Sequence, residues 1–221
     1  MIYQPYIFNV ILVVVAYLLG SIPTSVWIGK VFYGIDIREH GSGNAGTTNT
    51  FRILGLKAGI PVFIFDVFKG WAAVKLIYFS DYYIPASGDY INIQLLFGLA
   101  ALFGHIFPVY VGFKGGKGVA TLFGIIIGIH PAAALILIGI FSVSLVFSRY
   151  VSLSAMIAGF SFPVLMLFVF NTTTISLIIF SMIIAVLLLL THQKNIERLL
   201  KREESKLTIK KSSKETNKGK S

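Results

Sequence analysis

The sequence predicts an all-α, polytopic integral membrane protein with about seven transmembrane helices, its N-terminus outside and its C-terminus cytoplasmic. Three observations lead to this prediction. Hydrophobic residues make up 56% of the 221 residues and charged residues only 13%, whereas soluble domains carry about 25% charged residues. The mean hydropathy is +0.82, and the apolar residues form long runs. Basic residues also alternate between successive connections.

A transmembrane helix requires roughly 20 apolar residues. The runs that meet or approach this length lie at about 7–29, 57–79, 92–112, 117–129, 131–147, 151–170 and 173–191. The fourth run is short, and the His130–Pro131 pair that ends it could be a kink within one longer helix. Five or six spans are therefore alternatives to seven. The first run lacks a basic flank and a cleavage site, so we expect a retained span rather than a signal peptide.

The distribution of Lys and Arg predicts the orientation. These residues occur in the connections 30–57, 113–118 and 148–151 and in the C-terminal tail, whereas 80–91 and 171–174 contain none. Because Lys and Arg favour cytoplasmic loops, the alternation fits an outside N-terminus and a cytoplasmic C-terminus. Every polar, glycine-rich stretch then lies on the cytoplasmic side.

Two regions are predicted: a transmembrane domain over 1–200 and a basic, disordered cytoplasmic tail over 201–221. Residues 192–221 contain ten Lys or Arg against four Glu. Beside membrane spans, such a tail is expected to contact anionic lipid headgroups rather than nucleic acid. The chain has no cysteine, which excludes disulfides, thiolate nucleophiles and Cys-ligated zinc.

The stretch from Arg38 to Arg52, REHGSGNAGTTNTFR, is a polar island in this apolar sequence. Glycines let backbone N–H groups approach a ligand, and hydroxyls, amides and guanidinium groups donate hydrogen bonds to oxygen. The combination suits a phosphate ester. The alternative is an ordinary loop between helices. The candidate ligand-binding residues are Ser42, Asn44, Thr48, Asn49 and Arg52.

A second polar stretch, FKGGKGVAT, begins at Phe113 and leads into the fourth apolar run. Lysines and glycines at the start of a helix favour an anion. The stretch lacks the first glycine and the Ser or Thr of a nucleotide-binding P-loop, so we expect a phosphate site without nucleotide. The alternative is a basic cytoplasmic turn. The candidate residues are Lys114, Gly115, Gly116, Lys117 and Gly118.

A third stretch, THQKNIERL, follows the last apolar run, and its His192 and Asn195 share one face of a continuing helix. His192 could donate to phosphate, act as a general acid or base, or only cap the interface. Within the second run, Asp66 and Lys69 are three residues apart, so they form either a structural ion pair or part of the site.

With these blocks in place, the sequence resembles the bacterial membrane acyl-phosphate:glycerol-3-phosphate acyltransferases, the PlsY family. The blocks that carry the resemblance are LLGSIPTS, IDIREHGSGNAGTTNTFRILG, GHIFPVYVGFKGGKGVAT, RYVSLSAMIAG and HQKNIERLL. The resemblance implies essential roles for Ser42 and Arg52, phosphate binding at 114–118, and catalytic roles for His192 and Asn195. The chain departs from the family pattern at Thr191, where Arg is common, and at Arg202, which replaces the Gly of a G-x-E pattern ending at Glu204.

The resemblance implies transfer of a fatty acyl group from acyl phosphate to the 1-hydroxyl of glycerol 3-phosphate, giving lysophosphatidic acid and phosphate at the start of phospholipid synthesis. It also implies a bacterial plasma membrane location with a cytoplasmic active site. We expect the two substrates and membrane lipids as partners, and neither cofactor nor metal. His192 or a substrate phosphate oxygen would take the hydroxyl proton. The alternative function is a membrane transporter for a phosphorylated solute.

Overall fold

The computed structural model describes residues 4–80, 84 and 87–207, and these residues form helices and loops without a β-strand. The α-helices are α1 (Gln4–Ser21), α2 (Thr24–Tyr33), α3 (Thr47–Leu54), α4 (Leu56–Lys75), α5 (Gly88–Ile106), α6 (Val119–Ile129), α7 (Pro131–Ser148), α8 (Val151–Val164), α9 (Ile175–Thr191) and α10 (Gln193–Leu200). Short 3-10 turns cover Ile37–Glu39, Leu76–Phe79 and Val109–Val111, and a π-helical turn, Leu165–Val169, continues α8. The predicted all-helical fold is confirmed.

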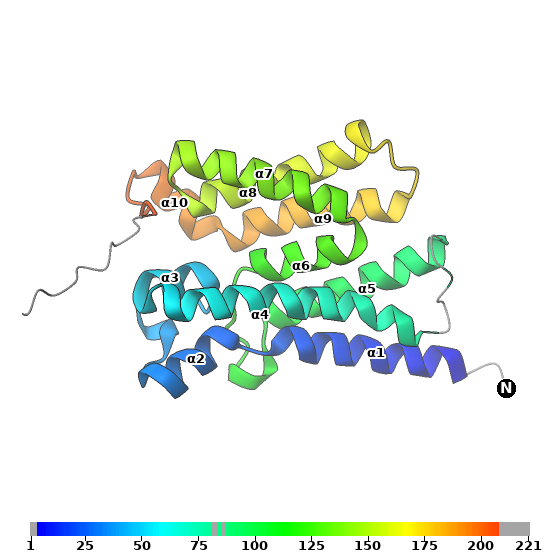
Figure 1. Ribbon diagram of the computed structural model, residues 1–221, viewed down its shortest axis with the longest axis horizontal. Coiled ribbons are helices and arrows are strands. Elements are labelled where there is room, and N and C mark those ends of the chain that lie inside the picture. Colours follow the sequence, from blue (N-terminus) through cyan, green and yellow to red (C-terminus); the bar gives the residue numbers. More distant parts are fainter. Residues whose placement is uncertain (1–3, 81–83, 85–86, 208–221) are drawn as a thin grey trace, which may run out of the picture.

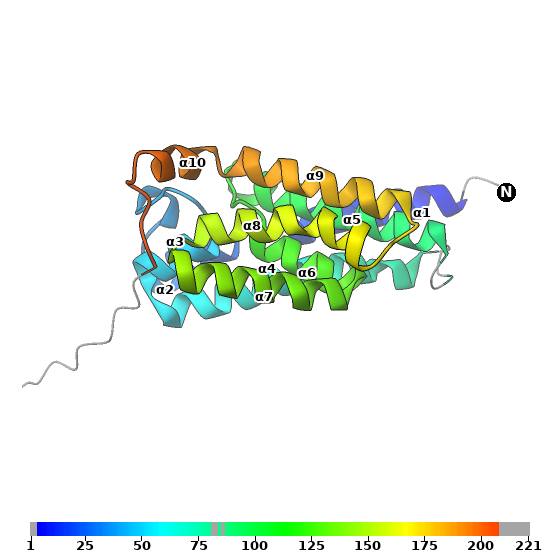
Figure 2. The ribbon, with the colours of Figure 1, turned by 90° about the horizontal axis from the view of Figure 1, so that it is seen from above.

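The long helices lie side by side along the longest axis of the molecule, with the shorter α6 among them (Figure 1). Three short helices, α2, α3 and α10, gather at the end opposite the N-terminus, and the view from above shows the same grouping (Figure 2). The polar stretches that contain α3 and α10 are thereby brought together, although they are more than a hundred residues apart in the sequence.

Three of the described helical segments are long and apolar enough to cross a membrane: Gly88–Val111, Pro131–Ser148 and Val151–Val169. The number rises to five if two bent pairs, α1 with α2 and α9 with α10, each count as one span. Helix α6 is apolar but has only 11 residues. Each of the seven predicted runs is helical, and the number of spans stays a prediction.

The first predicted span, 7–29, is not one continuous helix. It breaks between Ser21 and Thr24, and the two parts are bent by 41°. Pro23 has no N–H to donate, and its ring disfavours helical geometry at Ile22 before it. The carbonyl of Ile22, which the break leaves without a helical partner, accepts a hydrogen bond of 2.8 Å from Lys69 Nζ.

Close helix packing at glycines brings the backbones of the central helices together. A side chain at Gly124 of α6 would collide with the Val67 carbonyl of α4, and one at Gly70 of α4 with the Thr121 carbonyl of α6. Small residues at such crossings are typical of helices that pack within a membrane. The contact fixes the N-terminal end of α6, which forms one wall of the site described next.

Of the predicted tail, residues 201–207 are described, and the Glu204 side chain is only 5% exposed. Leu207 N–H donates to the Arg149 carbonyl over 2.8 Å, so this segment crosses to the turn between α7 and α8. Residues 208–221 lie outside the described residues. The division of the chain at residue 200 and the disorder beyond it stay predictions.

Candidate functional site

A cavity of about 430 Å³ is lined by residues of the short helices α3 and α10 and of helices α6 to α9, and it has two different walls. One wall is polar and comes from the loop before α3, from α3 and α10, from the first tail residues, and from single residues of α4, α5, α8 and the loop before α6. The other is apolar and comes from α6, α7, α8 and α9. The polar lining residues include Ser42, Asn44, Thr47, Thr48, Asn49, Arg52, Asp66, His105, Lys117, Ser152, His192, Asn195, Arg198 and Glu204.

Asn49 holds the loop before α3 in shape. Its side-chain Nδ2 donates to the carbonyls of Ile37 (3.1 Å) and His40 (2.9 Å), and its Oδ1 accepts from Ser42 N–H (3.0 Å). The residue is 2% exposed. Gly41 lies against this amide with φ +62°, where a side chain would collide with Asn49 Oδ1. The amide predicted to bind phosphate is thus used within the loop, next to Ser42, which lines the cavity.

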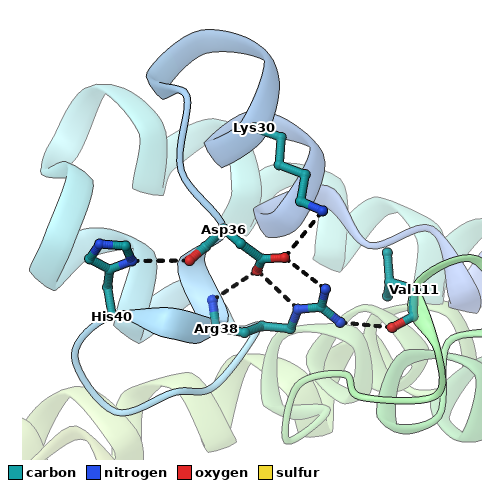
Figure 3. A network of polar contacts seen from close by, with 5 residues as sticks. All are labelled: Lys30, Asp36, Arg38, His40 and Val111. Atoms are coloured by element: carbon teal, nitrogen blue, oxygen red, sulfur yellow. Dashed lines mark hydrogen bonds and ion pairs between the residues drawn. The ribbon is translucent and has the colours of Figure 1, made fainter.

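The start of the same loop is fixed by an ion cluster around Asp36 (Figure 3). The Asp36 carboxylate accepts from Arg38 Nε (2.9 Å) and Nη2 (2.7 Å) and lies 3.2 Å from Lys30 Nζ. The hydrogen bonds from the Arg38 guanidinium hold the pKa of Asp36 far below its usual range. Arg38 also donates to the Val111 carbonyl over 2.7 Å, and His40 Nδ1 lies 3.1 Å from the Asp36 carbonyl.

Arg38 therefore closes the loop against the segment after α5 and does not line the cavity. Arg52, at the other end of the loop, does line it, and its side chain is exposed. Within the described part of the chain, no hydrogen bond or ion pair engages the Arg52 guanidinium. Of the two arginines that bound the polar island, only Arg52 is available to an anion.

The glycine-rich second stretch divides between the cavity and the protein interior. Lys117 and Gly118 line the cavity, whereas Lys114 is exposed outside it. The N–H groups of Gly115 and Gly116, predicted as phosphate donors, instead donate to the carbonyls of Ile106 and His105, each over 3.1 Å. Gly116 also packs directly on the His105 ring, where a side chain would collide with Nε2. This stretch brings one lysine to the site.

His192 lies at a 61° bend between α9 and α10, so the predicted continuing helix is broken there. The residue is 2% exposed and lines the cavity. Its Nδ1 lies 2.8 Å from the Leu188 carbonyl, which can only accept, so Nδ1 carries the proton and Nε2 has a free lone pair. Burial, together with the charge of Lys117, lowers the pKa of His192 to about 4. The imidazole is neutral at neutral pH.

Lys117, Asn195 and Glu204 form a chain of hydrogen bonds across the polar wall. Lys117 Nζ donates to Asn195 Oδ1, and Asn195 Nδ2 donates to Glu204 Oε1 over 2.6 Å. Glu204 also accepts from Arg198 Nε and from Ser152 Oγ, each over 2.7 Å. Burial raises the pKa of Glu204, but these hydrogen bonds outweigh it and leave the pKa below its usual value.

These hydrogen bonds place Asn195 and Glu204 together on the polar wall of the cavity, and their roles in the reaction stay predictions. Arg198 and Ser152 were missed by the sequence reasoning. Arg198 had a usable signal, because it follows Asn195 by three residues and so lies on the same helix face. Ser152 lies in the block RYVSLSAMIAG that carries the family resemblance, but its hydrogen bond to Glu204 forms only through the tertiary fold.

Asp66 and Lys69 of α4 form a buried ion pair of 2.8 Å, with side chains 2% and 5% exposed. Asp66 also accepts from the hydroxyls of Thr24 and Thr47, each over 3.4 Å, and Lys69 donates to the Ile22 carbonyl. Thr47 is the first residue of α3, so the pair connects α4 to the site loop and to the break after α1. Asp66 lines the cavity, and Lys69 lies behind it.

Comparison with known proteins agrees with this geometry. The profile of the family described as glycerol-3-phosphate acyltransferase matches residues 10–202. A curated glycerol-3-phosphate acyltransferase of Chlorobaculum tepidum is 43% identical over 222 residues, covering 90% of this chain and 96% of the relative. One of Chlorobium phaeobacteroides strain BS1 is 40% identical over 225 residues, with the same coverage of both chains.

Two crystal structures of PlsY, described as an integral membrane glycerol 3-phosphate acyltransferase, have the same fold. The glycerol 3-phosphate form is 37% identical with a TM-score of 0.80, covering 90% of this chain and 96% of that one. The lysophosphatidic acid form is 36% identical with a TM-score of 0.77, covering 91% and 96%. The likeness extends over most of both chains, and the family match over residues 10–202 includes the polar stretches 38–52 and 113–121. This chain is an integral membrane protein that belongs to the glycerol-3-phosphate acyltransferase family, the PlsY family.

Proposed function

We propose that this protein transfers a fatty acyl group from acyl phosphate to the 1-hydroxyl of glycerol 3-phosphate, releasing lysophosphatidic acid and phosphate. The observation that carries the proposal is that one cavity joins a cationic, hydrogen-bonding wall to an apolar wall. A phosphorylated glycerol requires the first, and a fatty acyl chain requires the second. The family membership and the glycerol 3-phosphate and lysophosphatidic acid forms of the related PlsY structure support the same reaction.

The phosphate groups of the two substrates are assigned to Arg52 and Lys117, which both line the cavity. A planar guanidinium can hold two phosphate oxygens at once, and a lysine provides a compact point charge. Ser42, Asn44 and Thr48 supply neutral donors beside them. Gly115 and Gly116 take a packing role, because their N–H groups already donate within the protein.

The transfer needs no covalent enzyme intermediate, because acyl phosphate is already activated. The 1-hydroxyl oxygen attacks the acyl carbonyl carbon, the bond from that carbon to the phosphate oxygen breaks, and phosphate leaves with the electron pair. Holding the two substrates aligned can contribute roughly 7–11 kcal/mol. Fixed cations on the departing phosphate stabilise the charge that develops there.

The hydroxyl proton is assigned to a phosphate oxygen rather than to His192. Burial holds the pKa of His192 at about 4, whereas the second pKa of a phosphate monoester is about 6, so the phosphate is the stronger base. The free lone pair on His192 Nε2 can still accept a hydrogen bond from the hydroxyl and orient it for attack. His192→Ala should then lower turnover by misplacing the hydroxyl.

For the membrane arrangement we propose seven spans in a bacterial plasma membrane, with the N-terminus outside and the cavity facing the cytoplasm. The alternation of Lys and Arg supports this orientation. Helix α4 reaches the required length with the turn that follows it, and its buried charges are paired internally. Helix α6 is shorter, and it is covered by α4, α5 and α7. Acyl phosphate would reach the apolar wall from the surrounding lipid.

The decisive experiment measures phosphate release by the purified protein in detergent, supplied with long-chain acyl phosphate with and without glycerol 3-phosphate. We expect release that requires both substrates and falls by roughly a hundredfold or more in Ser42→Ala and in Arg52→Ala, since each removes a donor from the developing charge. Lys114→Ala is the matched control, because that cation lies outside the cavity. A wild-type protein that binds glycerol 3-phosphate but releases no phosphate would refute the enzyme and leave transport into liposomes to be tested.

A further inference from the structure

The apolar part of the cavity ends at a floor to which four helices contribute. On each of these helices the lining residue farthest from the polar wall along the helix is Ile126 of α6, Leu137 of α7, Phe162 of α8 and Ile184 of α9. Each of these side chains is at most 5% exposed, and all four belong to one contiguous hydrophobic cluster. Four helices therefore close the cavity at about the same level.

The depth of this floor follows from the helix rise of about 1.5 Å per residue. Phe162 comes ten residues after Ser152, which lies at the polar wall, so it is about 15 Å deeper along α8. Ile184 comes eight residues before His192, or about 12 Å along α9. One leaflet of a bilayer has a hydrocarbon depth of about 15 Å, half of the roughly 30 Å core. The apolar part of the cavity thus has the length of one lipid chain in one leaflet.

The floor is backed by closely packed side chains and is not a thin partition. The Phe162 ring meets the Phe180 ring edge to face, with 6.3 Å between centroids. Met166 and Leu177 lie beyond it, 0% and 4% exposed, and none of these three lines the cavity. Because such a core has no spare volume, a chain that reaches Phe162 cannot extend further without displacing it.

Above the floor, small residues on α8 keep the channel open. Ala155, Ala158 and Gly159 all line the cavity between the polar wall and Phe162. A side chain at Gly159 would collide with Leu188 of α9. A larger residue at Ala158 would occupy the channel about 9 Å below Ser152, six residues along the helix.

We infer that Phe162 sets the upper limit of acyl-chain length and that Ala158 keeps the lower half of the channel open. The inference rests on the proposed function, because it assumes that the apolar wall binds the fatty acyl chain of the substrate. A chain longer than the channel must fold back, turn aside between the helices toward the lipid, or displace the floor. A shorter chain loses apolar contact with the channel, and kcat/KM should fall about fourfold for each methylene removed.

The test compares kcat/KM across a graded series of saturated acyl phosphates, from medium-chain to very-long-chain, at saturating glycerol 3-phosphate. Phe162→Ala should raise the preference for chains longer than the wild-type optimum by about tenfold or more, and Ala158→Leu should move the optimum to shorter chains. Phe160→Ala is the matched control, since that residue is on the same helix, is 44% exposed and does not line the cavity. It should keep the wild-type profile.

A second measurement separates failure of this inference from failure of the proposed reaction. Thermal stabilisation by lysophosphatidic acids of graded chain length reports the fit of the chain without turnover. Active Phe162→Ala and Ala158→Leu variants with the wild-type chain-length profile would overturn the inference and leave the acyltransferase intact. A wild type that turns over no acyl phosphate would refute the reaction. The inference on chain length would then be tested by whether the two variants change the dependence of thermal stabilisation on the chain length of lysophosphatidic acid, and an unchanged dependence would overturn it. Phe162→Leu replaces Phe162→Ala if the alanine variant does not fold.

Discussion

Replacing Lys69 by methionine should destabilise the fold, because it leaves a buried carboxylate without its cation. Lys69 Nζ lies 2.8 Å from both Asp66 Oδ1 and the Ile22 carbonyl. Methionine keeps most of the side-chain volume but donates no hydrogen bond. Asp66 would retain only the two 3.4 Å hydrogen bonds from Thr24 and Thr47. The Ile22 carbonyl at the break between α1 and α2 would lose the Lys69 donor and keep only the Thr24 N–H at 3.1 Å.

Removing one partner of a buried ion pair typically costs about 3–5 kcal/mol. In a chain of this size each kcal/mol lowers the melting temperature by about 2–4 °C, so the expected fall is about 6–20 °C. The assay is thermal unfolding in detergent, followed by tryptophan fluorescence. Trp71 is two residues after Lys69 on the same helix and reports its unfolding directly.

The matched control is Lys57→Met, which removes an exposed lysine from the first turn of α4. It should change the unfolding free energy by less than about 0.5 kcal/mol. The double variant Asp66→Asn with Lys69→Met should be more stable than the sum of the single changes implies, because neither charge is then left alone. A melting temperature for Lys69→Met within about 2 °C of wild type would refute the reasoning.

Three further predictions concern the polar wall. Burial holds the pKa of His192 at about 4 against an ordinary 6.5, so the unfolded chain takes up this proton at a higher pH than the folded chain does. The unfolding free energy of wild type should therefore fall relative to that of His192→Gln as the pH drops from about 6.5 to 4. Unfolding free energies that change equally with pH in the two proteins would contradict this. Burial also lowers the pKa of Lys117 to about 8, so the KM for glycerol 3-phosphate should rise as the pH passes 8, and Lys117→Arg should move that rise to higher pH. Glu204→Ala frees the Asn195 amide and should raise the same KM about 10- to 100-fold, whereas Lys114→Ala should leave it within about twofold.

The sequence by itself determined the helical membrane fold and which polar segments contribute residues to the cavity. Long apolar runs can satisfy their backbone hydrogen bonds in a bilayer only as helices or closed barrels, and runs near 20 residues select helices. Against such a background, polar stretches such as Arg38–Arg52 stand out because they could not remain in hydrocarbon. The motif order then identified the family, and Ser42, Arg52, Lys117, His192 and Asn195 all line one cavity.

Only the tertiary structure decided which of the predicted residues face the cavity and which support it. Arg38 and Asn49 are residue types that can donate hydrogen bonds to a phosphate. In the fold, however, Arg38 donates to Asp36 and Asn49 donates to carbonyls of its own loop. Gly115 and Gly116 direct their N–H groups to carbonyls at the end of α5. The physical reason is that a donor's availability depends on which acceptors the fold brings within about 3 Å, and residue type alone does not determine this. The depth of the apolar channel likewise depends on where four helices, distant in sequence, close against one another.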